Sequence, residues 1–389
     1  MKHTVCVITG TRAEFGLLQP LIRKLNNDEE INLQLVVTGS HLSAAFGNTQ
    51  TEIEDAGFPV YARVPISLEG DSKLDMVKTT AEAISAFADY FSANRPDLLV
   101  VLGDRYEIFG ASTAAAMLGI PIAHLHGGET TEGAVDEFLR HSITKMSTIH
   151  FTACEQYKNR VIQLGEVPER VFDVGALGVE NIINLPEIPL EELGEKLKTD
   201  INDTQYGLII FHPTTQEQGT AEHQVKELIK AISSFDRMKF LIIKSNADAG
   251  GRLINSIWDE EAKKHDTWVL VSSLTSRLYL TALKHAEVMI GNSSSGIIEA
   301  PALHIPVINI GDRQKGRLMA DSVICCEPNA EDIISAIKRA VSPEFRRGVE
   351  ETKSPFGDGN TSDLIVCEIK RFLASDRIDT KKAFYDIRF

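Results

Sequence analysis

The stretch DLLVVLGDRYEIFGASTAAAMLGIPIAHLHGG, residues 97–128, contains the pattern that decides the fold. It begins with an apolar run at 98–102, continues with a longer amphipathic segment at 106–118, and ends with a second apolar run at 120–125. Continuous apolar runs are typical of strands buried on both faces, and a helix between two of them indicates a parallel pair. The stretch therefore predicts an α/β protein built on a parallel sheet.

The same alternation continues along the chain on both sides of this stretch. Segment 184–196, NLPEIPLEELGEK, interrupts it with two prolines and clustered acids, which predicts a linker near residues 180–195. The alternation restarts at YGLIIFHP, residues 206–213. Because 389 residues are more than one core usually fills, we expect two Rossmann-like doubly wound domains that face a cleft.

The composition and charge of the chain limit the kinds of molecule that it is expected to bind. The formal net charge is -15 and no basic stripe interrupts it, so we expect neither nucleic acid nor a membrane surface as a partner. No stretch reaches the roughly 18 apolar residues of a spanning helix, and no cleavage site follows the apolar N-terminal run. The five cysteines show no C-x-x-C spacing, and four lie in or beside apolar runs. We therefore expect a cytoplasmic protein with reduced, buried thiols.

Polar clusters follow the predicted strands at their carboxyl ends, where parallel sheets bind ligands. In the first domain these clusters are GTRAEFG (10–16), TGSH (38–41), LGDRYE (102–107) and HLHGGETTEGAVDEFLRH (124–141). In the second they are FHPTT (211–215), KSNADAGG (244–251), GNSSSGIIE (291–299) and IGDRQKGR (310–317).

The cluster at 291–299 has the features of a phosphate-binding turn. Its serines and Gly296 lie where a strand passes into a helix, so amide hydrogens, hydroxyls and the helix dipole are directed at one place. Glu299 is placed to accept ribose hydroxyls, and Arg313 to bind the same diphosphate. The structural alternative is a serine-capped helix followed by a solvated glutamate.

Two familiar motifs are absent from the sequence. GDRQKGR differs from a P-loop because Arg317 and Leu318 occupy the positions of the lysine and the metal-binding hydroxyl. No G-x-G-x-x-G follows the first strand, so no nicotinamide site is expected. The HLH segment places His124 and His126 on one strand face, where they could hold a metal or orient a sugar beside the neighbouring acids. We expect no metal and no cofactor.

Taken together, these motifs resemble the hydrolysing UDP-N-acetylglucosamine 2-epimerases of bacterial sialic acid synthesis. The resemblance rests on TGTRAEFG, VLGDRYEIF, HLHGGETTEGAVDEFLRHSITKMS, KSNADAG, GNSSSGIIEAP and INIGDRQKGR, and on the C-terminal FYDI. It implies a glycosyltransferase-B-like fold. The first domain would then span 1–180, completed by a C-terminal helix at about 360–389, and the second 181–359. The family releases UDP and N-acetylmannosamine without metal or redox cofactor.

The resemblance also implies the site residues. Acid and base roles fall on Asp104, His126 and Asp136, with Glu129 and Glu137 as further candidates. His126 stands where the non-hydrolysing epimerases and the animal relatives have glutamate. Contacts with the UDP-sugar fall on eight positions, with UDP bound mainly by the second domain: Arg12, Arg105, His212, Asn246, Ser293, Ser294, Glu299 and Arg313.

The implied chemistry is elimination followed by hydration. A carboxylate such as Asp104 removes the C2 proton as UDP departs, and water then adds to the resulting 2-acetamidoglucal while C2 is reprotonated from the other face. Several alternatives share these residues: the same reaction on UDP-N,N'-diacetylbacillosamine for legionaminic acid, a non-hydrolysing epimerase, a glycosyltransferase, or a nucleotide-sugar sensor. The partner expected is a UDP-sugar, and the chain is expected to form a homodimer or homotetramer.

Overall fold

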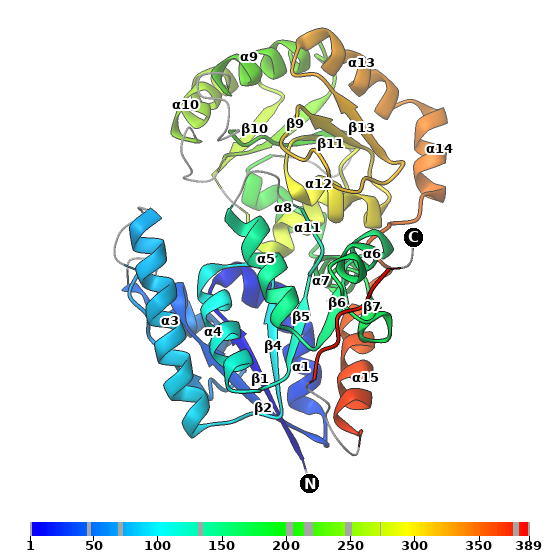
Figure 1. Cartoon of the computed structure of the whole chain (residues 1–389). Helices are drawn as coiled ribbons and strands as arrows, with labels where there is room; N and C mark the ends of the chain where they lie inside the picture. The colour runs from blue at the N-terminus through cyan, green and yellow to red at the C-terminus, as the bar shows by residue number, and fades with distance from the viewer. Residues whose placement is uncertain are drawn as a thin grey trace. The chain divides into compact units, whose positions relative to one another are not determined.

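The computed structural model describes residues 2–44, 48–68, 73–130, 135–199, 205–213, 221–245, 251–272, 274–375 and 381–387. The chain divides into two compact units, each with its own parallel sheet and hydrophobic core (Figure 1). Unit 1 comprises Met1–Asn181 and Gly357–Phe389, and unit 2 comprises Ile182–Phe356.

Unit 1 contains a seven-stranded sheet in the order β3-β2-β1-β4-β5-β6-β7, with every pair parallel. The strand order reverses between β1 and β4, which is the switch point where such sheets bind ligands. The strands are β1 (His3–Thr9), β2 (Ile31–Val37), β3 (Ala62–Arg63), β4 (Leu98–Leu102), β5 (Ile122–Leu125), β6 (Ile149–Thr152) and β7 (Val171–Asp173).

Helices cover both faces of this sheet, which explains the unbroken apolar strands. Along β1, Val5 and Val7 belong to the core on one face, whereas Cys6 and Ile8 belong to the core on the other. The helices are α1 (Arg12–Asn27), α2 (Gln50–Asp55), α3 (Lys73–Ala93), α4 (Tyr106–Met117), α5 (Val135–Met146), α6 (Glu155–Gln163), α7 (Leu177–Asn184) and α15 (Thr361–Leu373), with 3-10 turns η1 (Gly39–Leu42) and η3 (Pro168–Arg170).

The last helix, α15, lies in unit 1 against α1, as the red and blue ribbons in Figure 1 show. Glu180 holds this packing together because it is buried and meets both helices. It accepts a 2.5 Å hydrogen bond from the backbone amide of Ser362 and lies 3.2 Å from the Lys24 ammonium. The C-terminal segment thus completes the core of unit 1.

Unit 2 repeats the same topology with six parallel strands in the order β10-β9-β8-β11-β12-β13, so its switch point lies between β8 and β11. The strands are β8 (Tyr206–Ile210), β9 (Lys239–Ile243), β10 (Trp268–Val271), β11 (Val288–Gly291), β12 (Val307–Ile310) and β13 (Val323–Cys326). The helices are α8 (Leu190–Leu197), α9 (Ala221–Ile232), α10 (Gly251–Glu261), α11 (Ser276–Lys284), α12 (Ser294–Ile298), α13 (Ala330–Ala340) and α14 (Pro343–Glu351), with 3-10 turns η4 (Ala262–Lys264) and η5 (Ala300–Leu303).

The boundary between the two units falls at Asn181–Ile182, within the predicted linker segment 180–195, but this segment is mostly helical, so the expectation of an irregular linker was wrong. It contains the end of α7 and most of α8, and only residues 185–189 separate the two helices. Pro189 precedes the first turn of α8, where the two glutamates favour a helix start, and Leu193 and Leu197 are buried one turn apart. Pro189 and the two glutamates after it, which suggested an irregular linker, therefore form the start of α8.

The prediction of buried thiols was correct for two cysteines and wrong for two. Cys6 and Cys154 are buried, whereas Cys325 and Cys367 are exposed, and all five are free. Cys325 lies on β13, the edge strand of its sheet, and Cys367 lies on the outer side of α15. In the part of the chain that the structure describes, no helix is long and apolar enough to cross a bilayer.

Candidate active site

A residue in the left-handed backbone conformation follows β4 and another follows β5, and each turns the chain sharply at the carboxyl end of its strand in the unit 1 sheet. Gly103, after β4, has φ +71°, and His126, after β5, has φ +63°. A positive φ is uncommon for a residue with a Cβ and recurs at functional sites. These turns place Asp104 and His126 at the adjacent ends of two paired strands.

Arg140 of α5 gathers the acids around these turns. Its side chain is buried, with 3% of the residue exposed. The guanidinium donates through Nε to Oδ2 of Asp104 at 2.8 Å and through Nη2 to the same oxygen. Nη1 donates to the Glu129 carbonyl at 2.8 Å and to Oε2 of Glu137 at 3.1 Å. One buried cation therefore links the ends of β4 and β5 to α5.

Asp104 is a carboxylate with opposing influences on its protonation. Burial raises its pKa, and the charges of Asp136 and Glu129 raise it further, while the ion pair with Arg140 works in the opposite direction. The net effect is a raised pKa. Asp104 thus combines a fixed orientation with greater basicity than an ordinary aspartate, which suits a general base.

His126 lies next to this network and pairs with Glu129. Its Nδ1 is 3.1 Å from Oε1 of Glu129, and its side chain is 15% exposed. Its Nε2 is buried and has no hydrogen-bond partner among the described residues. A carboxylate on one ring nitrogen fixes the orientation of the imidazole and its tautomer.

The remaining predicted acids lie at the start of α5. Glu137 bonds Arg140 and also lies 3.2 Å from Nε2 of His141. Asp136 is exposed, and the structure connects it to the network through its electrostatic effect on Asp104. The structure therefore brings Asp104, Glu129 and Glu137 onto one arginine, with Asp136 at the margin.

His124 has a different environment from His126. It is buried within β5, with Nε2 2.8 Å from the Gly103 carbonyl and Nδ1 3.1 Å from Oγ1 of Thr144. Burial lowers its pKa to about 3, so the ring is neutral. One nitrogen thus holds the turn after β4 and the other contacts α5. His124 is structural, and no group of three metal-ligating side chains occurs within the described ranges.

Two predicted arginines follow β1 and β4. Arg12, the first residue of α1, is exposed and pairs with Glu52 at 2.9 Å. Arg105 directly follows Asp104 and pairs with buried Glu107 at 2.5 Å. Both lie at the switch point of the unit 1 sheet, at the end where ligands bind.

In unit 2, β11 ends at a position that only glycine can occupy. Gly291 has φ +143°, and a Cβ there would lie 1.9 Å from the carbonyl oxygen of Ile210 on β8. The missing side chain lets the two strand ends approach closely at the switch point.

Asn292, the next residue, organises the strand ends of unit 2. Its side chain exchanges two 2.8 Å hydrogen bonds with the backbone of His212. Its carbonyl accepts bonds of 2.9 Å from Nη1 of Arg313 and from Nε2 of Gln314. Nδ1 of His212 lies 3.1 Å from Oγ of Ser245. Asn292 thus fixes the predicted residues His212 and Arg313 on three neighbouring strand ends.

The serine cluster begins a helix, as the sequence predicted, but a short one. Ser293 is the N-cap of α12, its hydroxyl accepting from the Ser295 amide at 3.3 Å, and Ser294 is exposed. Glu299 ends the helix and accepts a hydrogen bond from Ser295, whose hydroxyl also bonds Tyr279. Burial raises the pKa of Glu299. Asn246, also predicted for UDP, lies outside the described residues.

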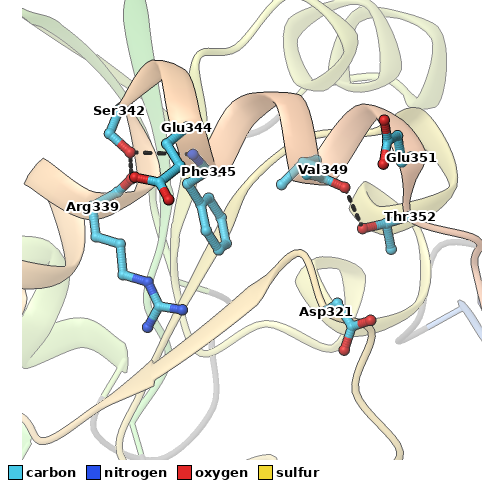
Figure 2. A pocket seen from close by; sticks show the side chains of 9 residues that line it. Asp321, Arg339, Ser342, Glu344, Phe345, Val349, Glu351 and Thr352 are labelled. Carbon is cyan, nitrogen blue, oxygen red and sulfur yellow. Dashed lines mark hydrogen bonds between the residues drawn. The ribbon is translucent and has the colours of Figure 1, made fainter.

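A separate hollow of about 620 Å³ lies along α13 and α14. Figure 2 shows Arg339 beside the Phe345 ring, with the guanidinium carbon 5.2 Å from the ring centre. Ser342 caps α14 by accepting from the Phe345 amide at 3.3 Å. These contacts are those of a helix start. None of the predicted site residues lines this hollow.

Two parallel α/β units, each with convergent polar side chains at its switch point, form the architecture of glycosyltransferase-B-like nucleotide-sugar enzymes. The family model for UDP-N-acetylglucosamine 2-epimerase matches residues 23–370. The chain therefore belongs to the UDP-N-acetylglucosamine 2-epimerase family of enzymes.

Individual relatives agree with this assignment. A GDP/UDP-N,N'-diacetylbacillosamine 2-epimerase (hydrolyzing) from Campylobacter jejuni is 40% identical over 347 residues, covering 89% of each chain. The polysialic acid biosynthesis protein P7 of Escherichia coli is 41% identical over 384 residues, covering 98% of this chain and 97% of that one. A crystal structure of UDP-GlcNAc 2-epimerase from Neisseria meningitidis, bound to UDP-GlcNAc, superposes with a TM-score of 0.76 at 19% identity, covering 95% of this chain and 100% of that one. The family and fold class predicted from the motifs are confirmed.

Sequence reasoning missed Arg140 and Asn292. Helical spacing could have found Arg140, because it lies three and four residues before Ile143 and Thr144, both buried. A buried arginine on a helix beside predicted acids indicates a paired site. Asn292 could not be singled out in the sequence because its role depends on contacts with His212, 80 residues away.

Proposed function

We propose that this protein is a hydrolysing UDP-N-acetylglucosamine 2-epimerase that converts UDP-N-acetylglucosamine and water into N-acetylmannosamine and UDP. The observation that carries the proposal is the Asp104–Arg140–Glu129–His126 network in a chain of this family. It supplies a basic carboxylate at the end of β4 and, at the end of β5, an imidazole nitrogen that has no partner among the described residues.

The first step is elimination. Asp104 takes the C2 proton, the C1–O bond breaks with its electron pair moving to the diphosphate, and a C1–C2 double bond forms. A C2 hydrogen with no adjacent carbonyl is weakly acidic, so stabilising the departing diphosphate is the main requirement. Arg105, Arg12 and Arg313 with the serine hydroxyls are the groups proposed to supply this stabilisation.

The second step is hydration of the glycal. Water adds its oxygen to C1, and C2 receives a proton on the face opposite the one that lost it. His126, oriented by Glu129, is the proposed donor or relay on that face, with Asp136 the further candidate. Two proton-transfer groups on two strand ends satisfy the need for action on opposite faces.

The nucleotide is proposed to bind at the strand ends of unit 2. His212, Ser293, Ser294 and Arg313 would contact the diphosphate and uridine, and Glu299 the ribose. Because Ser295 and Tyr279 already engage the Glu299 carboxylate, ribose binding would add to this hydrogen-bonded group rather than fill an unoccupied one.

The hydrolysing form is favoured over the non-hydrolysing one by the segment after β5. This chain has HLHGGE at residues 124–129. The non-hydrolysing epimerases have the motif H-x-E-A-G-L-R at the same place. A second candidate substrate, UDP-N,N'-diacetylbacillosamine, is favoured by the name of the Campylobacter relative, a GDP/UDP-N,N'-diacetylbacillosamine 2-epimerase. The name of the Escherichia relative, a polysialic acid biosynthesis protein, favours the sialic acid route instead.

The test is to incubate the protein with each UDP-sugar in turn, without any acceptor, and to identify both products. We expect free UDP and free N-acetylmannosamine from UDP-N-acetylglucosamine. A product still carrying UDP would indicate a non-hydrolysing epimerase, and absence of UDP release would indicate a transferase or sensor. Turnover only of the diacetamido sugar would establish the second substrate.

A further inference from the structure

Two buried glutamates lie together at the ends of β1 and β4, apart from the Arg140 network. Glu14 of α1 is 7% exposed and Glu107 of α4 is fully buried. Coulomb interaction between them raises the pKa of Glu14, in addition to the larger effect of burial. Arg105 supplies one positive charge for the two carboxyl groups.

Each glutamate is held by one oxygen only. Oε2 of Glu14 accepts from the Gly10 amide at 2.8 Å, and Oε1 of Glu107 accepts from Nε of Arg105 at 2.5 Å. The second oxygens, Oε1 of Glu14 and Oε2 of Glu107, are buried and have no partner among the described residues. Two buried oxygens without donors are costly unless a proton lies on one of the carboxyl groups.

Gly10 brings the two carboxyl groups together. A Cβ on Gly10 would lie 2.9 Å from Oε1 of Glu107 and 3.2 Å from Oε2 of Glu14. Both groups therefore occupy the space that a side chain at Gly10 would fill, at the switch point of the unit 1 sheet.

We infer that Glu14 carries a proton that it shares with Glu107, and that this carboxyl pair positions Arg105 for the diphosphate of the substrate. The inference rests on the proposed function for the identity of the anion. Glu107 pairs with Arg105, and the proton of Glu14 lies between the two carboxyl groups. The pair adds one negative charge rather than two.

The surroundings leave Arg105 as the main counter-charge. On α4, Tyr106 lies beneath the Arg105 guanidinium, 5.5 Å from it to the ring centre. On η1, His41 bonds the hydroxyls of Thr9 and Thr49, and burial lowers its pKa to about 4, so it is neutral. On α1, Arg12 pairs with Glu52 instead.

A simple capping role for Glu14 makes a different prediction. Glu14 lies three residues after the N-cap Thr11, as in a capping box, and a cap works with an ionised carboxylate. Burial and the charge of Glu107 instead raise the pKa of Glu14 to about 8. A capping carboxylate would be ionised at neutral pH, whereas the shared-proton pair requires a neutral acid.

Infrared spectroscopy of the full-length protein labelled with carboxyl-13C glutamate tests the shared proton independently of activity. We expect a protonated-carboxyl C=O band at pH 7 that loses intensity in Glu14→Gln and is unchanged in the exposed control Glu29→Gln. Absence of that band from the wild-type protein, or an unchanged intensity in Glu14→Gln, overturns the shared proton whether or not the protein is an epimerase.

Calorimetric UDP binding tests the positioning of Arg105. We expect Glu14→Gln, which keeps a donor toward Glu107, to bind within about twofold of wild type, and Glu107→Gln to bind about tenfold more weakly. Wild-type affinity should fall as pH rises through about 8, and this step should be missing in Glu14→Gln. Unchanged affinity in Glu107→Gln, with folding intact, overturns the positioning role. A wild-type protein that binds no UDP overturns the proposed function and this role together, while the infrared band still decides the shared proton.

Discussion

The strand ends of unit 1 and unit 2 have the same topology but opposite chemistry. In unit 1, Arg140 pairs with the side chains of Asp104 and Glu137 and bonds the Glu129 carbonyl. In unit 2 the corresponding centre is Asn292, a neutral amide that bonds backbone groups and receives Arg313. The strand ends of unit 1 thus gather acids around a buried cation, whereas those of unit 2 are organised by a neutral amide.

This difference shows how one topology supports two tasks. Acids around a buried cation have shifted pKa values, as Asp104 does, and suit proton transfer. An arginine is always charged and presents a planar fork of donors, so Arg313 suits an anion such as a diphosphate. The predictions below separate the two regions by what each variant should damage.

The largest effect is expected from Asp104→Asn, which keeps the size of the side chain but removes its basicity. We expect kcat to fall by roughly 10²–10⁴-fold, as for loss of a general base. UDP affinity should change little, because the carboxylate is not proposed to bind the nucleotide. Steady-state kinetics and calorimetry measure the two quantities, with exposed Asp89→Asn as the control. Activity in Asp104→Asn equal to that of the control would remove Asp104 from the mechanism.

Gly291→Ala should be the most destabilising change in unit 2. The new methyl group would lie 1.9 Å from the Ile210 carbonyl, so β11 and β8 must separate. We expect a loss of about 2–4 kcal/mol in the free energy of unfolding, measured by urea denaturation. Gly348→Ala is a matched control, because a Cβ there meets nothing within 4 Å, and α14 should be slightly stabilised. Equal stability of the two variants would contradict the close approach at the switch point.

Arg313→Ala should affect nucleotide binding and leave the acid network intact. Loss of a charged donor to a diphosphate weakens binding by about 1–3 kcal/mol. The measurement is the UDP dissociation constant, with exposed Arg347→Ala from the same unit as the control. If both variants bind UDP like the wild type, the assignment of the nucleotide to the unit 2 strand ends is wrong.

A smaller effect is expected on the free energy of unfolding at low pH, which should depend on buried Glu166 in unit 1. Burial tends to raise the pKa of Glu166, but hydrogen bonds from His150, Lys145 and Lys382 outweigh it and hold the pKa at about 2. Because this pKa is below that of an unfolded glutamate, about 4.3, the stabilisation is complete above that value and is lost as pH falls toward 2.

Glu166→Gln should therefore cost about 1–2 kcal/mol of unfolding free energy at pH 7 and progressively less between pH 4 and pH 2. Denaturant titrations at several pH values measure this difference, with the exposed Glu344→Gln variant of unit 2 as the control. A difference between wild type and Glu166→Gln that stays constant with pH would exclude the lowered pKa as its cause.

The fold class was predictable because parallel strands buried on both faces have unbroken apolar sequences. The unbroken apolar runs at 98–102 and 206–210 needed helices on both faces, and the structure has them. The helix at 190–197 was not predicted because prolines just before a segment and acids at its beginning occur both in linkers and at helix starts. Cys325 is exposed because β13 is an edge strand. The order of strands depends on pairing between segments that are distant in the sequence, so this exposure could not be predicted from the local pattern.

The candidate site was predictable only as separate motifs. The positions of Asp104, His126, Ser293 and Arg313 at strand ends follow from the sequence pattern. The roles of Arg140 and Asn292 depend on contacts between elements 36 and 80 residues apart, which a motif does not contain. The shared space of Glu14 and Glu107 around Gly10 is likewise a tertiary feature.

The most direct measurement of the central claim is the reaction in heavy water, with the released hexosamine examined by NMR and mass spectrometry. If unit 1 removes a proton from C2 and returns another from solvent, every product molecule carries deuterium at C2. Asp104→Asn should form this product at least about 10²-fold more slowly. Product that keeps protium at C2 would contradict elimination and hydration as the reaction of this site.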